Sequence, residues 1–226
     1  MIIGEKSTKV KNACKFFYTM LEKMDLINLF TKMGDLALDI NKLSVFPSLI
    51  LQVSKYINET ECDQIYQKLL EEDTHTHEAF APLKDKAKSS HKIDSDILKK
   101  VKINFKNILN QYSELTGFTF KNEITNSWFN IQKKDSVLKD HTHPLTVVAG
   151  VLFINVDDKA SPIYFQNPNP HINYTAIEKN TPYSFEWVKC IPKKGDLYLF
   201  PGWLKHGSFN DKNMCENRTV ISFNAI

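Results

Sequence analysis

The chain has 226 residues, and its 42% hydrophobic and 24% charged residues are typical of a globular protein with a sizeable core. A net charge of +3, with lysines spread along the chain, gives no support for a nucleic-acid partner. The longest apolar run falls far short of the roughly 20 residues of a membrane-spanning helix, and the polar first residues do not resemble a signal peptide.

Helical periodicity dominates the first half of the chain. Apolar residues recur at helical spacings over residues 8–42 and predict a helical segment there. A strand is expected at 45–53, followed by helices at 60–72 and 94–116. Gly117 is a typical residue to end the last of these helices.

After Gly117 the apolar pattern changes from helical to alternating, which indicates strands. Asn, Asp, Gly and Pro residues separate the candidate strands as turns do. The candidate strands are 124–132, 146–156, 162–166, 183–189, 195–200, 206–210 and 217–224. Helices followed by many short strands favour a mainly β fold, an antiparallel jelly roll with flanking helices.

Three histidines have the arrangement of a metal site. His141 and His143 precede the longest predicted strand, and alternate residues of an extended segment point the same way, so both imidazoles can face one ion. His206 follows a later strand and can reach the same end of a jelly roll. Three ligands on one face of an octahedral iron leave positions for a chelating 2-oxo acid and for dioxygen.

Arginine occurs only once among the 29 basic residues, as Arg218. A guanidinium binds a carboxylate through two parallel hydrogen bonds, which an ammonium cannot do. In the last predicted strand Arg218 shares a face with Val220, Ser222 and Asn224. We therefore expect Arg218 to pair with the distal carboxylate of a bound 2-oxoglutarate and Ser222 to add a hydrogen bond. The alternative is that the chain has kept this one arginine by chance.

Several segments, taken in order, resemble a known family. They are Ile124–Asn130, His141–Pro144, Ala149–Phe153, Gly195–Pro201, His206 and Arg218–Asn224. Together they are similar to the 2-oxoglutarate/Fe(II)-dependent oxygenases common in bacteria and phages, which are distant relatives of the prolyl hydroxylases. The resemblance spans residues 45–226 and implies a double-stranded β-helix (cupin-like) core with Fe(II) on the three histidines and 2-oxoglutarate on the arginine. The domain organisation predicted is a helical extension, 1–43, ahead of an oxygenase domain, 44–226.

Two positions depart from the wider superfamily. Most members have Asp or Glu where this chain has His143, and three neutral imidazoles leave the iron formally +2 instead of +1. That charge favours an anionic co-substrate and disfavours oxidation of the iron. Prolyl hydroxylase relatives often carry a tyrosine near Phe153 that bonds the co-substrate, and Trp128, Asn130 or Gln132 are the candidate replacements.

Two other arrangements of ligands stay open. Asp140 could replace His143 as a ligand, although adjacent residues of a strand point to opposite sides. His75 and His77 form a second His-x-His pair, but no strand follows it and we interpret both as surface residues.

The resemblance implies a dioxygenase that hydroxylates a C–H bond while 2-oxoglutarate is converted to succinate and carbon dioxide. The substrate, a small molecule or a peptide, is unknown; a peptidyl side chain follows from the analogy with prolyl hydroxylases. The alternatives are a three-histidine dioxygenase that does not use 2-oxoglutarate and a non-catalytic jelly-roll binding or structural module.

The remaining expectations concern partners and location. We expect 2-oxoglutarate, dioxygen and the substrate as partners, no nucleic acid or membrane, and a homodimer by analogy with relatives. The four cysteines form no CxxC pair, which favours a reduced, cytoplasmic protein, in the host cytoplasm if the gene is a phage gene.

Overall fold

The structure is a computed structural model. It describes residues 48–76, 80–81, 87–90, 93–121, 123–169, 171–174 and 176–226. The predicted helical extension at 1–43 lies outside these described residues, as do His77 and His91. No helix in the described ranges is long and apolar enough to cross a membrane.

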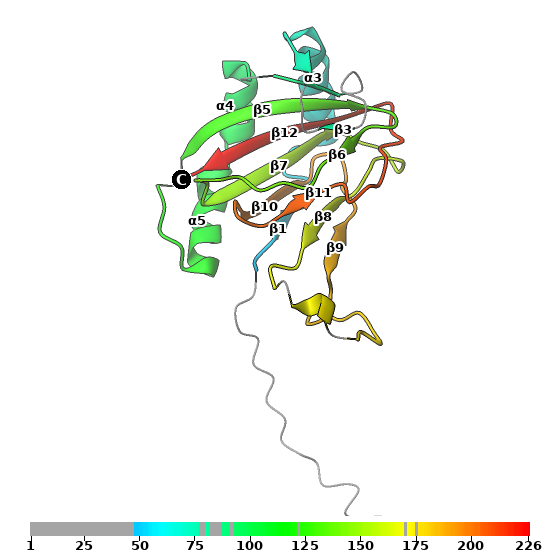
Figure 1. Ribbon diagram of the computed structural model, residues 1–226. Coiled ribbons are helices and arrows are strands. Elements are labelled where there is room, and N and C mark those ends of the chain that lie inside the picture. Colours follow the sequence, from blue (N-terminus) through cyan, green and yellow to red (C-terminus); the bar gives the residue numbers. More distant parts are fainter. Residues whose placement is uncertain are drawn as a thin grey trace, which may run out of the picture. The chain divides into compact units, whose positions relative to one another are not determined.

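A large antiparallel sheet and a small one form a barrel (Figure 1). The large sheet has the strand order β1 (Leu51–Val53), β10 (Leu197–Pro201), β7 (Val148–Asn155), β12 (Asn217–Ala225), β5 (Ile124–Lys133), β4 (Ala87–Ser89) and β2 (His75–Thr76). The small sheet has the order β11 (His206–Gly207), β8 (Ile163–Gln166) and β9 (Trp187–Cys190), with the 3₁₀ helix η2 (Ile172–Tyr174) in the β8–β9 connection. The strands β3 (Phe80–Ala81) and β6 (Val137–Leu138) form a separate pair. This arrangement confirms the mainly β class with flanking helices.

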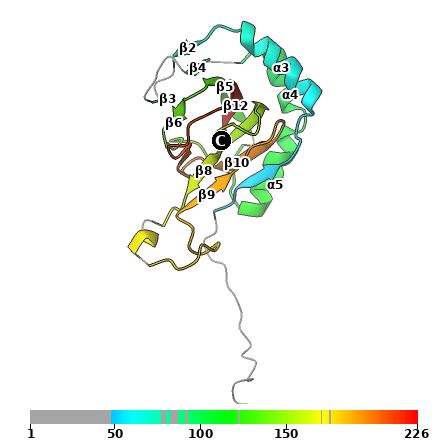
Figure 2. The ribbon, with the colours of Figure 1, turned by 90° about the vertical axis from the view of Figure 1, so that its right-hand side faces the viewer.

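Three helices cover the outer face of the large sheet, as the view in Figure 2 shows. Helix α3 (Glu59–Glu71) begins at Asn58, whose side chain accepts a hydrogen bond from the Glu61 amide. Helix α4 (Ser95–Lys102) begins at Asp94, whose carboxylate accepts from two backbone amides. Helix α5 (Phe105–Thr116) ends at Gly117, where a φ of +71° suits glycine.

The segment 94–116, expected as one helical region, is divided between α4 and α5 at Ile103 and Asn104. Val101 and Phe105 are both buried on either side of the break, whereas Ile103 is 76% exposed. The Tyr56 hydroxyl donates to the Val101 carbonyl, which satisfies an acceptor near the end of α4. The break lets two short helices follow a twisted sheet that one straight helix could not follow.

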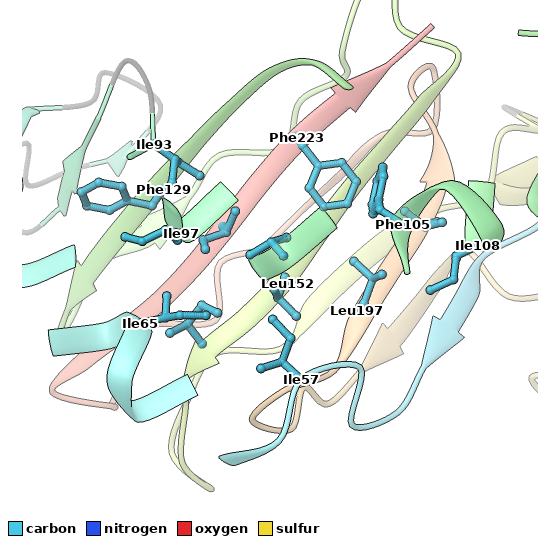
Figure 3. Close-up of a cluster of buried hydrophobic side chains, with 14 of the residues drawn as sticks. Ile57, Ile65, Ile93, Ile97, Phe105, Ile108, Phe129, Leu152, Leu197 and Phe223 are labelled. Carbon is cyan, nitrogen blue, oxygen red and sulfur yellow. The ribbon is translucent and has the colours of Figure 1, made fainter. Parts of the chain in front are cut away.

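The strands separate two apolar cores by the alternation of their side chains. Leu152 and Ile154 of β7 face the helices, whereas Val151 and Phe153 belong to the core inside the barrel. The outer core, drawn in Figure 3, also contains Phe129, Leu197, Leu199, Ile221 and Phe223 together with the buried faces of the helices. The inner core is smaller and contains Ala149, Val151, Phe153, Ile163, Phe165, Tyr198, Phe200, Leu204 and Val220. Most of the hydrophobic stabilisation therefore lies outside the barrel, which leaves room for polar groups within it.

Some strands are shorter than their sequence pattern predicted. The strand expected at 183–189 starts at Trp187, because Ser184 and Thr181 close a hydrogen-bonded turn before it. The strand expected at 206–210 ends at Gly207, since Phe209 and Asn210 adopt positive φ angles of 44° and 67°.

Candidate active site

The three histidines singled out from the sequence converge in space. Their ligand nitrogens all lie within 4.8 Å of one another. Backbone bonds fix this arrangement: His141 and His206 exchange N–H···O bonds of 2.9 and 3.0 Å, and the His143 amide donates to the Gly202 carbonyl at 2.7 Å. Gly202 permits that approach, because a Cβ there would lie 3.0 Å from the His143 carbonyl oxygen and 2.3 Å from that of Thr146.

Each imidazole has an oxygen acceptor at Nδ1. His141 Nδ1 lies 2.9 Å from the Lys139 carbonyl, and His206 Nδ1 lies 2.9 Å from the Leu204 carbonyl. His143 Nδ1 lies 2.6 Å from Oδ1 of Asn224. Because carbonyl oxygens only accept, Nδ1 carries the proton and Nε2 keeps its lone pair for a metal.

The imidazoles are neutral because they are removed from water. Burial, with a smaller contribution from the neighbouring His141, lowers the pKa of His143 to about 4, although the hydrogen bond that its ring donates to Asn224 acts in the opposite direction. Burial likewise lowers the pKa of His141, and it places that of His206 well below the usual value. Moreover, Nε2 of His143 is buried and has no hydrogen-bond partner among the described residues. A lone pair left in this way fits a bound cation.

Aromatic rings hold two of the imidazoles in place. Trp128 stacks on His143 with ring centroids 5.8 Å apart, and Phe200 lies 4.5 Å from His206. The Trp128 indole N–H in turn donates to Asn130 at 3.3 Å, with the Asn130 amide oriented so that its nitrogen also donates to the Ser89 hydroxyl at 2.8 Å. Trp128 and Asn130 thus support each other beside the histidines.

Arg218 is buried at 4% exposure without a carboxylate partner in the described ranges. Its Nε donates to the Ser161 carbonyl at 3.1 Å, and its Nη1 donates to Oε1 of Gln132 at 2.6 Å. The Phe153 ring lies against the guanidinium, 5.1 Å from its carbon. Burial lowers the pKa of Arg218 to about 10, so the group is still cationic at neutral pH. A buried cation with only neutral partners is a site for an anion.

One cavity of about 310 Å³ joins the histidines to the arginine. All seven residues proposed from the sequence line it, namely Trp128, Asn130, His141, His143, His206, Arg218 and Ser222. The register of β5 with β12 explains part of this, because Trp128 pairs with Ser222 and Gln132 pairs with Arg218. The face of β12 that lines the cavity carries Arg218, Val220, Ser222 and Asn224, the four residues that alternation placed together.

Two polar residues near Arg218 were only weakly indicated by the sequence. Gln132 was one of three candidates to replace a missing tyrosine, and no motif identifies Ser161. Alternation along the last strand predicted the side on which Asn224 lies, but not its contact with His143. Asp140, the alternative ligand, is not part of the histidine cluster; one of its oxygens is buried beside Gly207 without a hydrogen-bond partner among the described residues.

Comparisons with known proteins give a match to one family model and a likeness in fold. Residues 126–224 match a family model described as "Putative 2OG-Fe(II) oxygenase", which confirms the resemblance. No curated protein sequence matches the chain.

Several solved structures are similar to this one. HygX from Streptomyces hygroscopicus, with nickel and 2-oxoglutarate bound, is 12% identical with a TM-score of 0.56 over 78% of this chain and 82% of HygX. An oxidoreductase of the 2OG-Fe(II) oxygenase family from Burkholderia pseudomallei is 11% identical, with a TM-score of 0.56 over 78% of this chain and 82% of its own. A prolyl-4-hydroxylase from Pseudomonas putida is 9% identical, with a TM-score of 0.56 over 78% of this chain and 91% of its own. At such identities the likeness concerns the fold, and it confirms the double-stranded β-helix.

Proposed function

Since residues 126–224 carry the sequence pattern of the 2OG-Fe(II) oxygenase family, we propose that this protein is an Fe(II)- and 2-oxoglutarate-dependent dioxygenase that hydroxylates its substrate. The observation that carries the proposal is the convergence of three neutral imidazoles in a cavity that also contains an unpaired guanidinium. Metal ligands and a carboxylate partner are the two requirements for holding a 2-oxo acid on iron.

His141, His143 and His206 would hold the iron. Their lone pairs and the orphaned Nε2 of His143 fit a divalent ion, and imidazole is a suitable ligand for Fe(II). When bound, Fe(II) supplies the redox centre at which oxidative decarboxylation of 2-oxoglutarate to succinate is coupled to oxygenation of the substrate. The protein's own part is to orient the ligands, to position both organic molecules and to exclude water.

Arg218 would bind the distal carboxylate of 2-oxoglutarate. That carboxylate needs a buried counter-charge, and Arg218 needs an anion for the same reason. Ser222, on the same strand face, also lines the cavity and can add a hydroxyl donor.

The substrate group that enters the cavity would be small and uncharged. A volume of about 310 Å³ is at the lower end of the roughly 300–1,000 Å³ of ligand pockets, and 2-oxoglutarate must share it. Among the described lining residues, Arg218 is the only one that is charged beside the neutral histidines. A single side chain of a peptide meets these conditions, and we propose it as the substrate class.

A second candidate is a three-histidine dioxygenase that works without a 2-oxo acid, favoured by His143 in the place of a carboxylate. Succinate formation by the iron-loaded protein separates the two candidates. We expect succinate only when 2-oxoglutarate and dioxygen are both present; its absence from iron-loaded protein under all conditions would favour the second candidate. The cytoplasmic location and the homodimer stay predictions, for which fractionation and light scattering are the measurements.

A further inference from the structure

Arg218 and Gln132 form a unit inside the barrel. The register of β5 and β12 places the two residues opposite each other, and the Arg218 Nη1 donates to the Gln132 Oε1 at 2.6 Å. Because a guanidinium only donates, this bond fixes which end of the Gln132 amide faces the arginine. The other end, Nε2, therefore has a defined direction.

That second end of the amide lacks an acceptor. Gln132 is 1% exposed and lines the cavity, and its Nε2 is buried without a hydrogen-bond partner among the described residues. The Ser161 hydroxyl is in the same condition, although the Ser161 carbonyl holds Nε of Arg218. Buried polar groups are rarely left without partners in a native protein.

The region around the guanidinium thus has more donors than acceptors. A guanidinium has five N–H donors. The described residues provide acceptors for Nε and Nη1 of Arg218, and both acceptors are neutral. The amide of Gln132 adds a further donor on the cavity lining. A carboxylate accepts at two oxygens and offers about four lone-pair sites, which matches this excess.

We propose that Gln132 is a second donor to the distal carboxylate of the co-substrate and makes the site selective for a dicarboxylic 2-oxo acid. The inference rests on the proposed function and adds a specificity-determining residue to it. Gln132 has two roles at once: its oxygen orients Arg218, and its nitrogen binds the anion. A purely structural glutamine would have only the first role.

Paired ligands test the idea without any substitution. Metal-loaded protein, with Ni(II) or with Fe(II) under anaerobic conditions, is titrated by calorimetry with 2-oxoglutarate and with its 5-methyl ester, in which only the distal carboxylate has lost its charge. We expect the ester to bind at least roughly 100-fold more weakly, because the buried donors and the cation lose their charged acceptor. Equal affinities would overturn the proposal.

Two substitutions isolate Gln132, and 2-oxobutyrate, which lacks the distal carboxylate, is the control ligand. Gln132→Glu gives Arg218 an internal anion and replaces the donor by an acceptor, so 2-oxoglutarate should bind about 100-fold more weakly. Gln132→Met removes the amide and should weaken binding about 10-fold. Binding of 2-oxobutyrate and of metal should stay within about 2-fold of wild type in both variants. Gln166→Met, in β8 and outside the cavity lining, is the matched control and should change neither affinity.

The outcomes separate the inference from the proposed function. Equal losses for 2-oxoglutarate and 2-oxobutyrate would show that Gln132 is only structural, and unchanged 2-oxoglutarate binding in both variants would also refute the inference. If wild-type protein binds metal but no 2-oxo acid, the proposed function fails and the inference fails with it.

Discussion

Replacement of Arg218 by methionine tests whether the arginine serves the ligand or the fold. Burial lowers the pKa of Arg218 from its usual value to about 10, and one pKa unit corresponds to about 1.4 kcal/mol, so the buried charge costs folding about 3 kcal/mol. Since the folded pKa is the lower one, this cost is fully present at pH 7 and fades only as the pH rises through about 10 toward the pKa of an exposed arginine.

Methionine removes that cost but leaves two acceptors, the Ser161 carbonyl and Oε1 of Gln132, without their donors. Two lost hydrogen bonds are worth about 2 kcal/mol together. We therefore expect the free energy of unfolding of the metal-free Arg218→Met protein to lie within about 1 kcal/mol of wild type. An arginine in a structural buried ion pair would instead cost roughly 3–5 kcal/mol when removed.

The assay is urea denaturation with and without 2-oxoglutarate on Ni(II)-loaded protein. At a ligand concentration 100 times the dissociation constant, wild type should gain about 2.7 kcal/mol, and Arg218→Met should gain almost nothing. Arg218→Lys keeps the charge but loses the bidentate geometry, so it should retain part of the gain. Two results would refute the reasoning: a metal-free Arg218→Met protein that is destabilised by more than about 3 kcal/mol, or a Ni(II)-loaded Arg218→Met protein that 2-oxoglutarate stabilises as much as wild type.

Three further predictions concern the metal site and the core. Asn224→Ala should weaken Fe(II) or Ni(II) affinity by roughly 10–100-fold, because His143 loses the acceptor that orients its ring; unchanged affinity in a metal titration would contradict this. Since burial lowers the pKa of all three histidines, and that of His143 to about 4, metal binding should persist below the pH near 6.5 at which exposed histidines would lose it, and it should be lost by about pH 4. Gly150→Ala should destabilise the protein by about 1–3 kcal/mol in urea, because its Cβ would lie 2.1 Å from the Phe223 ring; an unchanged midpoint would show that the ring can move.

Local patterns in the sequence predicted the longer strands and the sides on which their residues point. They missed the short strands β2, β3, β4 and β6, because two or three residues are too few to show an alternation, and the expectation that no strand follows the His75 and His77 pair was wrong, since His75 lies in β2 and pairs with β4. The alternation over 217–224 placed Arg218, Ser222 and Asn224 on one face, and this face lines the cavity. Strand ends were less predictable, since the positive φ angles of Phe209 and Asn210 follow from turn geometry that hydrophobic alternation does not record. The break between α4 and α5 was missed for a similar reason, because the helical stripe continues through it in the sequence.

Long-range hydrogen bonds were beyond the reach of sequence patterns. The contact of Gln132 with Arg218 joins residues 86 positions apart, and the contact of Asn224 with His143 joins residues 81 apart. Ser161 carries no local signal of its own, and its carbonyl meets Arg218 only because β8 closes the barrel.

By itself the sequence determined the chemistry that is available: a His-x-His pair, a distant histidine and a lone arginine. Each lies in or beside an extended segment, where the alternation of side chains defines the side to which a residue points. Only the tertiary structure decided which polar groups are left without hydrogen-bond partners, since the burial of a group and the hydrogen bonds that it can make depend on every neighbour that the fold brings together. The neutral state of the imidazoles and the unpaired charge of Arg218 are consequences of desolvation inside the closed barrel, a property that no local stretch of residues possesses.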